Sequence, residues 1–290
     1  MGKIKIFAGI CAFLMIGSLA AQVSVDLALA QHNYMQYEPI YAKVRLRNYS
    51  GKPLVFGKDA KLSGELLLEV EYNRRLIQPV NTGDMSLIGT VLMPGQTLEF
   101  IIPVNRYYKL TRPGKYHIHA YVRHAMLKDM FRSRDCVLDV VKGVEVWRRT
   151  VGVPDVLNGA PQTPSQSQSR TFVLRILEEN AVKYFYVIIE DSKKVYAVTR
   201  MGREVNSENY SAEIDMLSRM HLVVPLASKL YRYAVINQDG KIERQQILKA
   251  GKTKPGLLRN PDNGEVRCVG GTEALPGIDY KAPEKIEKHD

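Results

Sequence analysis

The sequence predicts an all-β protein built from short antiparallel strands, and three observations support this. Apolar and polar residues alternate along most of the chain, as they do in strands with one buried face. Clusters of Gly, Pro and Asn interrupt the alternation at short intervals, where turns are expected. No stretch of ten residues or more shows a competing helical period. Strands of this kind bury their apolar faces by packing as two layers.

The first 21 residues have the layout of a secretory signal peptide. Lys3 and Lys5 form a positive start, Ile6–Ile16 is an uncharged apolar run, and residues 17–21 are mostly small. The run is shorter than the roughly 20 residues that a membrane-spanning helix needs. We therefore expect cleavage near residue 21 and a mature protein outside the cytoplasm, periplasmic or secreted. An uncleaved anchor is the alternative.

Residues 22–143 are predicted to form an antiparallel β-sandwich. Seven or eight short strands fall within about 120 residues, which is the density of such a fold. Pro94-Gly95 and Pro113-Gly114 each open a strand. The residues expected to face the core of the clearest strands are Val23, Val25, Leu27, Leu29, Ile40, Ala42, Val44, Leu46, Tyr116, Ile118, Ala120 and Val122.

Local motifs in the same region resemble those of bacterial immunoglobulin-like domains. Glu38-Pro39-Ile40 opens an alternating strand that ends in the turn Asn48–Leu54. Pro94-Gly95-Gln96, followed by the aromatic stretch Tyr107–Tyr116, is similar to their closing half. The resemblance covers residues 23–142. It implies an immunoglobulin-like sandwich but no activity, because adhesion domains and proteinase inhibitors both use this layout.

The remainder of the chain is expected to contain a second β domain between less ordered segments. Residues 144–170 are interpreted as a connecting strand and a Pro-, Gly- and Ser-rich linker. Residues 171–249 are expected to form a smaller β-meander of two blade-like units, because Tyr196-Ala197-Val198 is echoed by Tyr233-Ala234-Val235. Two units cannot close a propeller, so a pair of packed meanders is favoured. Residues 250–290 are poor in apolar groups and are expected to be a mobile tail.

Basic charge is the most distinctive chemical feature of the chain. The formal net charge is +11, and the segment 106–149 alone holds eleven Lys and Arg against four Asp and Glu. An exported basic surface would attract an acidic glycan, an anionic lipid or another envelope protein. No RNA-binding or zinc-finger signature supports nucleic acid as a partner. A solvated surface without a ligand is the alternative.

The predicted anion-binding residues lie in and before one strand of the sandwich. In that strand Tyr116, Ile118, Ala120 and Val122 should face the core, so the intervening residues, including Tyr121, should form an exposed face. Histidines in such a face would add positive charge at acidic pH. The candidate anion-binding residues are Arg106, Arg112, Lys115, His117, His119 and Arg123.

The sequence contains none of the local catalytic motifs that we could test. GxSxG, SxxK, HExxH, GxGxxG and P-loop patterns are absent, so no catalytic residue, cofactor or metal site is predicted. We therefore expect an exported, non-catalytic binding or structural protein. One alternative is a secreted proteinase inhibitor that inserts segment 81–95 or 104–114 into a protease. Another is a hydrolase whose site is assembled from scattered residues.

Two cysteines would remain after signal cleavage. Export permits a disulfide between Cys136 and Cys268. The alternative for Cys136 is a buried thiol, because it lies in an alternating strand pattern.

Overall fold

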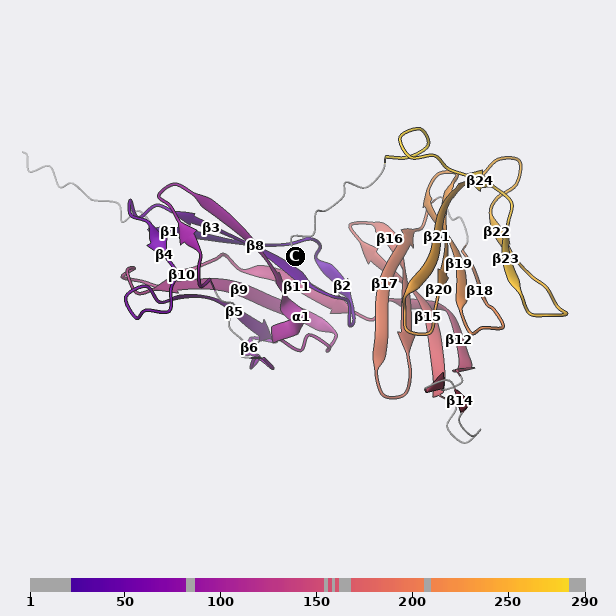
Figure 1. Cartoon of the computed structure of the whole chain (residues 1–290), viewed down its shortest axis with the longest axis horizontal. Coiled ribbons are helices and arrows are strands. Elements are labelled where there is room, and N and C mark those ends of the chain that lie inside the picture. The colour runs from indigo at the N-terminus through magenta and orange to yellow at the C-terminus, as the bar shows by residue number, and fades with distance from the viewer. Residues whose placement is uncertain are drawn as a thin grey trace, which may run out of the picture.

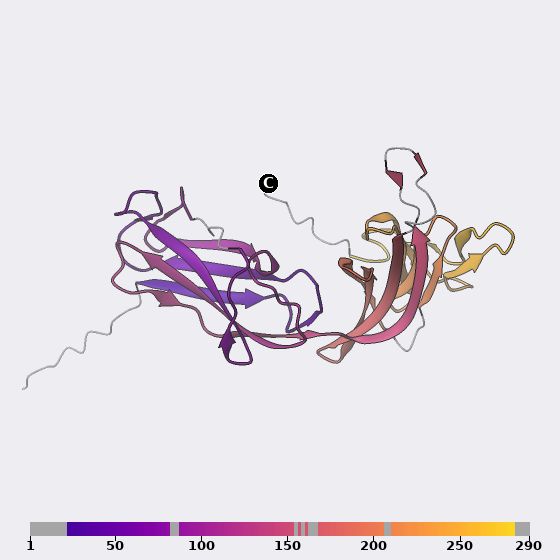
Figure 2. The ribbon, with the colours of Figure 1, turned by 90° about the horizontal axis from the view of Figure 1, so that it is seen from below.

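The chain folds into two β-sandwiches joined end to end (Figures 1 and 2). The structure is a computed structural model that describes residues 22–81, 87–153, 156–157, 160–161, 168–205 and 210–281, so the predicted signal peptide lies outside the described residues. Within that part of the chain the only helix is α1 (Val104–Tyr107), and no helix is long and apolar enough to cross a bilayer. The prediction of an all-β fold is therefore confirmed.

The first sandwich contains a three-stranded sheet and a six-stranded sheet. The smaller sheet has the order β1 (Val23–Leu29), β3 (Tyr41–Asn48) and β8 (Thr97–Pro103). The larger sheet has the order β2 (Asn33–Met35), β11 (Cys136–Val141), β9 (Gly114–His124), β5 (Gly64–Tyr72) and β6 (Arg75–Leu76), and β10 (Phe131–Arg132) also pairs with β9. A small pair, β4 (Leu54–Val55) and β7 (Val91–Leu92), lies at one end.

The alternating pattern correctly predicts the core of this sandwich. Along β3 every second residue is buried, and Ala42, Val44 and Leu46 are at most 1% exposed. Tyr116 and Ile118 of β9 pack into the same cluster from the opposite sheet. Burying these side chains supplies the main driving force for the two layers to pack, on the order of 2 kcal/mol for each large aliphatic group.

The second sandwich consists of two meanders packed face to face. The first has the order β12 (Val144–Val153), β15 (Gln168–Glu179), β16 (Val182–Glu190) and β17 (Val195–Arg203). The second has the order β18 (Ser211–Ile214), β19 (Met220–Ala227), β20 (Leu230–Ile236), β21 (Ile242–Lys249) and β24 (Thr272–Glu273). The short strands β13 (Val156–Leu157) and β14 (Ala160–Pro161) pair with each other. A pair of packed meanders was expected for this region. The sequence analysis had assigned β12 to the connection between the domains, but this strand pairs with β15 and belongs to the first meander.

The prediction of a mobile tail is wrong for residues 250–281. Strands β22 (Gly256–Arg259) and β23 (Val266–Val269) form a hairpin, and β24 pairs with β21. Leu257 and Cys268 of the hairpin pack on a buried cluster that includes Tyr233 of β20. The few apolar residues of this segment suffice for order because sheet β18–β24 offers them a preformed surface.

A compact joint holds the two sandwiches together. Met35 of β2 is 1% exposed and packs against Val173 and Tyr186 of the second sandwich. The buried carboxylate of Glu179 accepts hydrogen bonds from the backbone N–H groups of His32 at 3.0 Å and Asn33 at 2.8 Å. Apolar packing and charge-assisted hydrogen bonds thus cross the same junction.

Candidate functional site

The outer face of β9, predicted to bind anions, is largely occupied by the protein's own acidic groups. The β5 strand places Glu65 opposite Arg123 and Glu69 opposite His119. Arg123 forms an ion pair with Glu65. His117 Nδ1 lies 2.6 Å from the carboxylate of Asp135. Lys115 is exposed and forms no ion pair within the described part of the chain, so little uncompensated charge remains on this face.

The expectation that His119 and Tyr121 would be exposed is wrong. His119 is only 7% exposed and Tyr121 only 9% exposed. The Tyr121 hydroxyl donates to Glu69 Oε1 at 3.1 Å, and the guanidinium of Arg132 from the adjacent β10 lies over its ring. The alternating pattern identified the core face, but neighbouring long side chains cover the other face as well.

The two remaining candidates lie outside β9. Arg106 is exposed on α1, and Arg112 is exposed in the turn before β9. The backbone carbonyl of Arg112 accepts a hydrogen bond from Tyr116 at 2.7 Å, which fixes this turn to the core. The six predicted residues therefore do not share one open face.

The predicted disulfide is absent, because both cysteines are free thiols. Cys136 lies in β11 of the first sandwich, opposite Ile118. Cys268 lies in β23 and packs on the second sandwich. Burial raises the pKa of both thiols, as expected for cysteines that act as small apolar groups.

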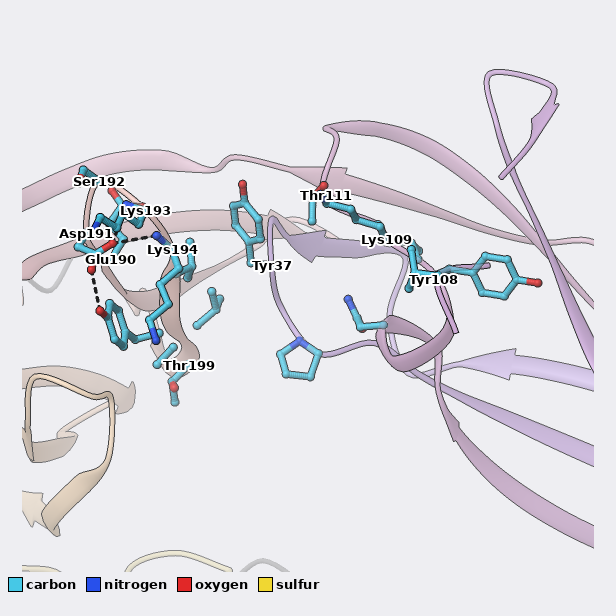
Figure 3. A pocket seen from close by; sticks show the side chains of 18 residues that line it. Tyr37, Tyr108, Lys109, Thr111, Glu190, Asp191, Ser192, Lys193, Lys194 and Thr199 are labelled. Carbon is cyan, nitrogen blue, oxygen red and sulfur yellow. Dashed lines mark hydrogen bonds between the residues drawn. The ribbon is translucent and has the colours of Figure 1, made fainter. Parts of the chain in front are cut away.

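A groove lies between the two sandwiches in the described part of the chain. Its volume is about 1070 Å³. One wall comes from the first sandwich, with Pro39, Asn105 and residues 108–111, and the other wall is residues 190–199 of the β16–β17 hairpin. Figure 3 shows the ring of Tyr37 between these two walls. Tyr37 is 46% exposed, so a flat aromatic surface is accessible in the groove.

The β16–β17 turn is held rigid by the side chain of Asp191. Its carboxylate accepts hydrogen bonds from the backbone N–H groups of Lys193 at 2.6 Å and Lys194 at 2.8 Å, and from the Tyr196 hydroxyl at 2.6 Å (Figure 3). The guanidinium of Arg170 lies 3.5 Å from Asp191 and 3.9 Å from the centre of the Tyr196 ring. The hydrogen bond from Tyr196 and those from the turn lower the pKa of Asp191 to about 2, so this carboxylate stays ionised.

The carboxylates that line the groove are thus paired with other groups of the protein, whereas its lysines form no ion pair within the described residues. Glu190 pairs with Arg148 at 3.4 Å, and Asp191 is committed to its own turn. Lys109, Lys193 and Lys194 are exposed, and none forms an ion pair with a carboxylate within the described residues. The ammonium group of Lys194 lies 4.3 Å from the centre of the Tyr196 ring. The groove therefore presents positive charge from both walls.

A half-buried carboxylate connects the first sandwich to the second close to the groove. Glu38, next to Tyr37 and Pro39, accepts a hydrogen bond from the backbone N–H of Met35 at 2.8 Å and one from the Tyr186 hydroxyl at 3.3 Å. Burial raises the pKa of Glu38, although these hydrogen bonds act against the increase. Because Tyr186 belongs to β16, this contact helps to fix the spacing of the two walls.

Comparisons with known proteins provide no family assignment. No protein-family model and no curated protein matches the sequence. Among solved structures, the chain is similar to the crystal structure of Spo0M, the sporulation control protein of Bacillus subtilis. The two share 13% sequence identity, the match covers 63% of this chain and 91% of that one, and the TM-score is 0.27. A TM-score this low supports no inference about fold or function.

Sequence reasoning missed the groove because its walls are at least 79 residues apart along the chain, from Thr111 to Glu190. One local signal was present. Asp191 is followed by Ser192, Lys193 and Lys194, and an Asp whose side chain accepts the next backbone N–H groups is typical of a tight turn. The juxtaposition with Tyr37 depends on the joint, which no local pattern predicts.

The segment 104–114, considered as an inhibitory loop, is anchored rather than protruding. Val104, Tyr108 and Leu110 are buried in the first core. Part of the other candidate segment, residues 82–86, lies outside the described residues. No group of three His, Cys, Asp or Glu side chains suited to a metal ion occurs in the described part of the chain.

Proposed function

We propose that this chain is an exported, non-catalytic binding protein that holds an anionic polymer in the groove between its two sandwiches. The observation that carries the proposal is the charge of the groove, where Lys109, Lys193 and Lys194 are unpaired while Glu190 and Asp191 are satisfied internally. A concave surface with convergent cations concentrates negative ligands more effectively than a flat one does.

An acidic glycan fits the groove best among the anionic polymers. The exposed ring of Tyr37 offers an apolar face against which a sugar ring can pack. Lysines on both walls can then contact carboxylate or sulfate groups along the polymer. Each exposed contact contributes roughly 1 kcal/mol or less, so several must act together.

A heparin column eluted with a salt gradient tests this proposal. The triple variant Lys109→Glu, Lys193→Glu and Lys194→Glu should elute at clearly lower salt and bind at least roughly tenfold more weakly. The matched control carries the same change in charge on and near β9, with Lys115→Glu, Arg123→Glu and Arg134→Glu. It should retain most of the affinity. An equal loss in both variants would show that only net charge matters, and the groove would not be the site.

The proposed export is tested separately. Cleavage is expected after Ala20 or Ala21, because the small residues before these positions suit a signal peptidase. N-terminal sequencing of the protein recovered from its native host decides the matter. A mature chain that still begins at Met1 would contradict cleavage.

A further inference from the structure

The first sandwich ends, far from the second one, in a set of interlocked loops that we call the distal tip (Figures 1 and 2). The distal tip comprises residues 48–65, 87–96 and 123–130. Strand β4 pairs with β7, which connects the first two segments. His124 connects the third, because its Nε2 lies 3.0 Å from the carbonyl oxygen of Val55 and its ring meets that of Phe56 edge to face.

This tip exposes an unusual concentration of large apolar side chains. Each of the six is between 44% and 54% exposed, whereas single exposed hydrophobic residues scattered over a surface are ordinary. The six are Tyr49, Ile88, Val91, Met93, Met126 and Met130. Three of the protein's ten methionines are among them, and methionine adapts readily to an irregular partner.

The loops that carry these side chains are anchored from below. Leu87 and Leu127 are buried next to the exposed Ile88 and Met126. The backbone N–H of Met126 donates to Nδ1 of the buried His124 at 3.0 Å. The apolar side chains therefore point outward from an ordered framework, and their exposure is a property of the fold.

Two of the tip segments that carry these apolar side chains also carry exposed lysines. The tip contains five Lys and Arg against three Asp and Glu. One of the acids, Glu65, is already paired with Arg123. The four lysines of the tip are Lys52, Lys58, Lys61 and Lys128. None of them forms an ion pair within the described residues. Apolar side chains among lysines match the boundary of an anionic bilayer, where the former enter the acyl region and the latter reach the headgroups.

The start of the described chain lies at the same tip. The backbone N–H of Tyr49 donates to the carbonyl oxygen of Gln22 at 2.8 Å. Only residues 17–21 separate Gln22 from the uncharged apolar run Ile6–Ile16. The segment proposed above to direct export is thus expected to join the fold where the exposed apolar side chains gather. We propose that the distal tip docks on an anionic lipid bilayer, leaving the groove and the second sandwich directed away from it.

Tryptophan reporters in the mature chain, which begins at Gln22 after the proposed cleavage, test this docking when the protein is mixed with vesicles that contain anionic lipid and brominated acyl chains. Met130→Trp and, in a second variant, Ile88→Trp place a reporter at the tip. Leu258→Trp, at a position 62% exposed in the second sandwich, is the matched control. The single native Trp147 lies in β12 and provides an internal reference in all three.

The proposal expects strong quenching of both tip reporters, little quenching of Leu258→Trp, and weaker quenching of the tip reporters in neutral vesicles or at high salt. Equal quenching at the tip and at position 258 would overturn it, as would no quenching at the tip. Because the mature chain lacks the apolar run Ile6–Ile16, quenching at the tip cannot come from insertion of that run. Glycan binding in the groove is a separate measurement, so either proposal can fail without the other.

Discussion

Strands β9 and β19 occupy comparable positions in the two sandwiches, yet the faces that point away from the cores are covered in different ways. Each has one face in a core, and the other face carries His117 and His119 in β9 and His221 in β19. In β19 both ring nitrogens of the buried His221 have partners, Asp215 at 3.1 Å and the Tyr233 hydroxyl at 2.9 Å. In β9 the Nε2 of His119 lies 3.5 Å from Asp135, and its Nδ1 has no partner among the described residues.

The difference reflects what covers each face. The hairpin β22–β23 lies against the outer face of β18 and β19, so the network around Asp215 is enclosed. Asp135, which lies just before β11 and beside β9, remains 41% exposed, and water competes for its carboxylate. A buried polar group depends on its protein partners far more than an exposed one does. The polar residues of β19 should therefore matter more for stability than those of β9.

The largest expected effect follows from removing Asp215. Its carboxylate accepts hydrogen bonds from His221, from the Arg219 guanidinium at 2.8 Å and from the backbone N–H of Leu217 at 2.9 Å. Asp215→Ala should destabilise the second sandwich by about 3 kcal/mol, because it leaves buried donors without an acceptor. Urea unfolding followed by the fluorescence of Trp147 measures this. The exposed Asp262→Ala is the control, and a similar small change in both would remove the distinction between the strands.

The two outer faces also show which part of the structure could be predicted from sequence. Alternation along β3 and β9 identified the core side chains correctly, because that signal is local. It did not identify the burial of His119, which lies opposite Glu69, 50 residues away, and close to Asp135 from a later loop. It also missed the hairpin that carries Leu257, since its order comes from a surface formed by earlier strands. The groove near Tyr37 was missed for the same reason.

The second expected effect is a pH dependence of the same network. Burial by itself would raise the pKa of Asp215, but hydrogen bonds from Arg219 and His221 outweigh it and lower the pKa. A carboxylate with a lowered pKa stabilises the fold above its unfolded value of about 3.9, and this contribution is lost as the pH falls through the folded value. The wild type should therefore lose more stability than Asp215→Ala between pH 5 and pH 3. Parallel losses in urea titrations at several pH values would contradict this.

A smaller effect is expected from the corresponding acid of the first sandwich. Asp135→Ala removes the 2.6 Å contact with His117 and the longer one with His119. The loss should be about 0.5–1 kcal/mol, because the carboxylate is partly solvated. Amide hydrogen exchange of β9 and β5 measures it, with the exposed Asp129→Ala as control. A loss as large as that of Asp215→Ala would mean that both faces are equally dependent on their networks.

The smallest effect should come from the ion pair between Arg123 and Glu65. Arg123 is 68% exposed, and the pair is screened by water and salt, so Arg123→Ala should change the stability of the first sandwich by no more than about 0.5 kcal/mol. The measurement is the same hydrogen exchange of β9 and β5, at low and high salt, with Lys128→Ala as control. A change above about 1 kcal/mol that disappears in high salt would show that charge pairing across β5 and β9 holds this face together. In that case the exposed acids and bases of β9 would form a structural network rather than a solvated surface, and the contrast with the enclosed network of β19 would be weakened.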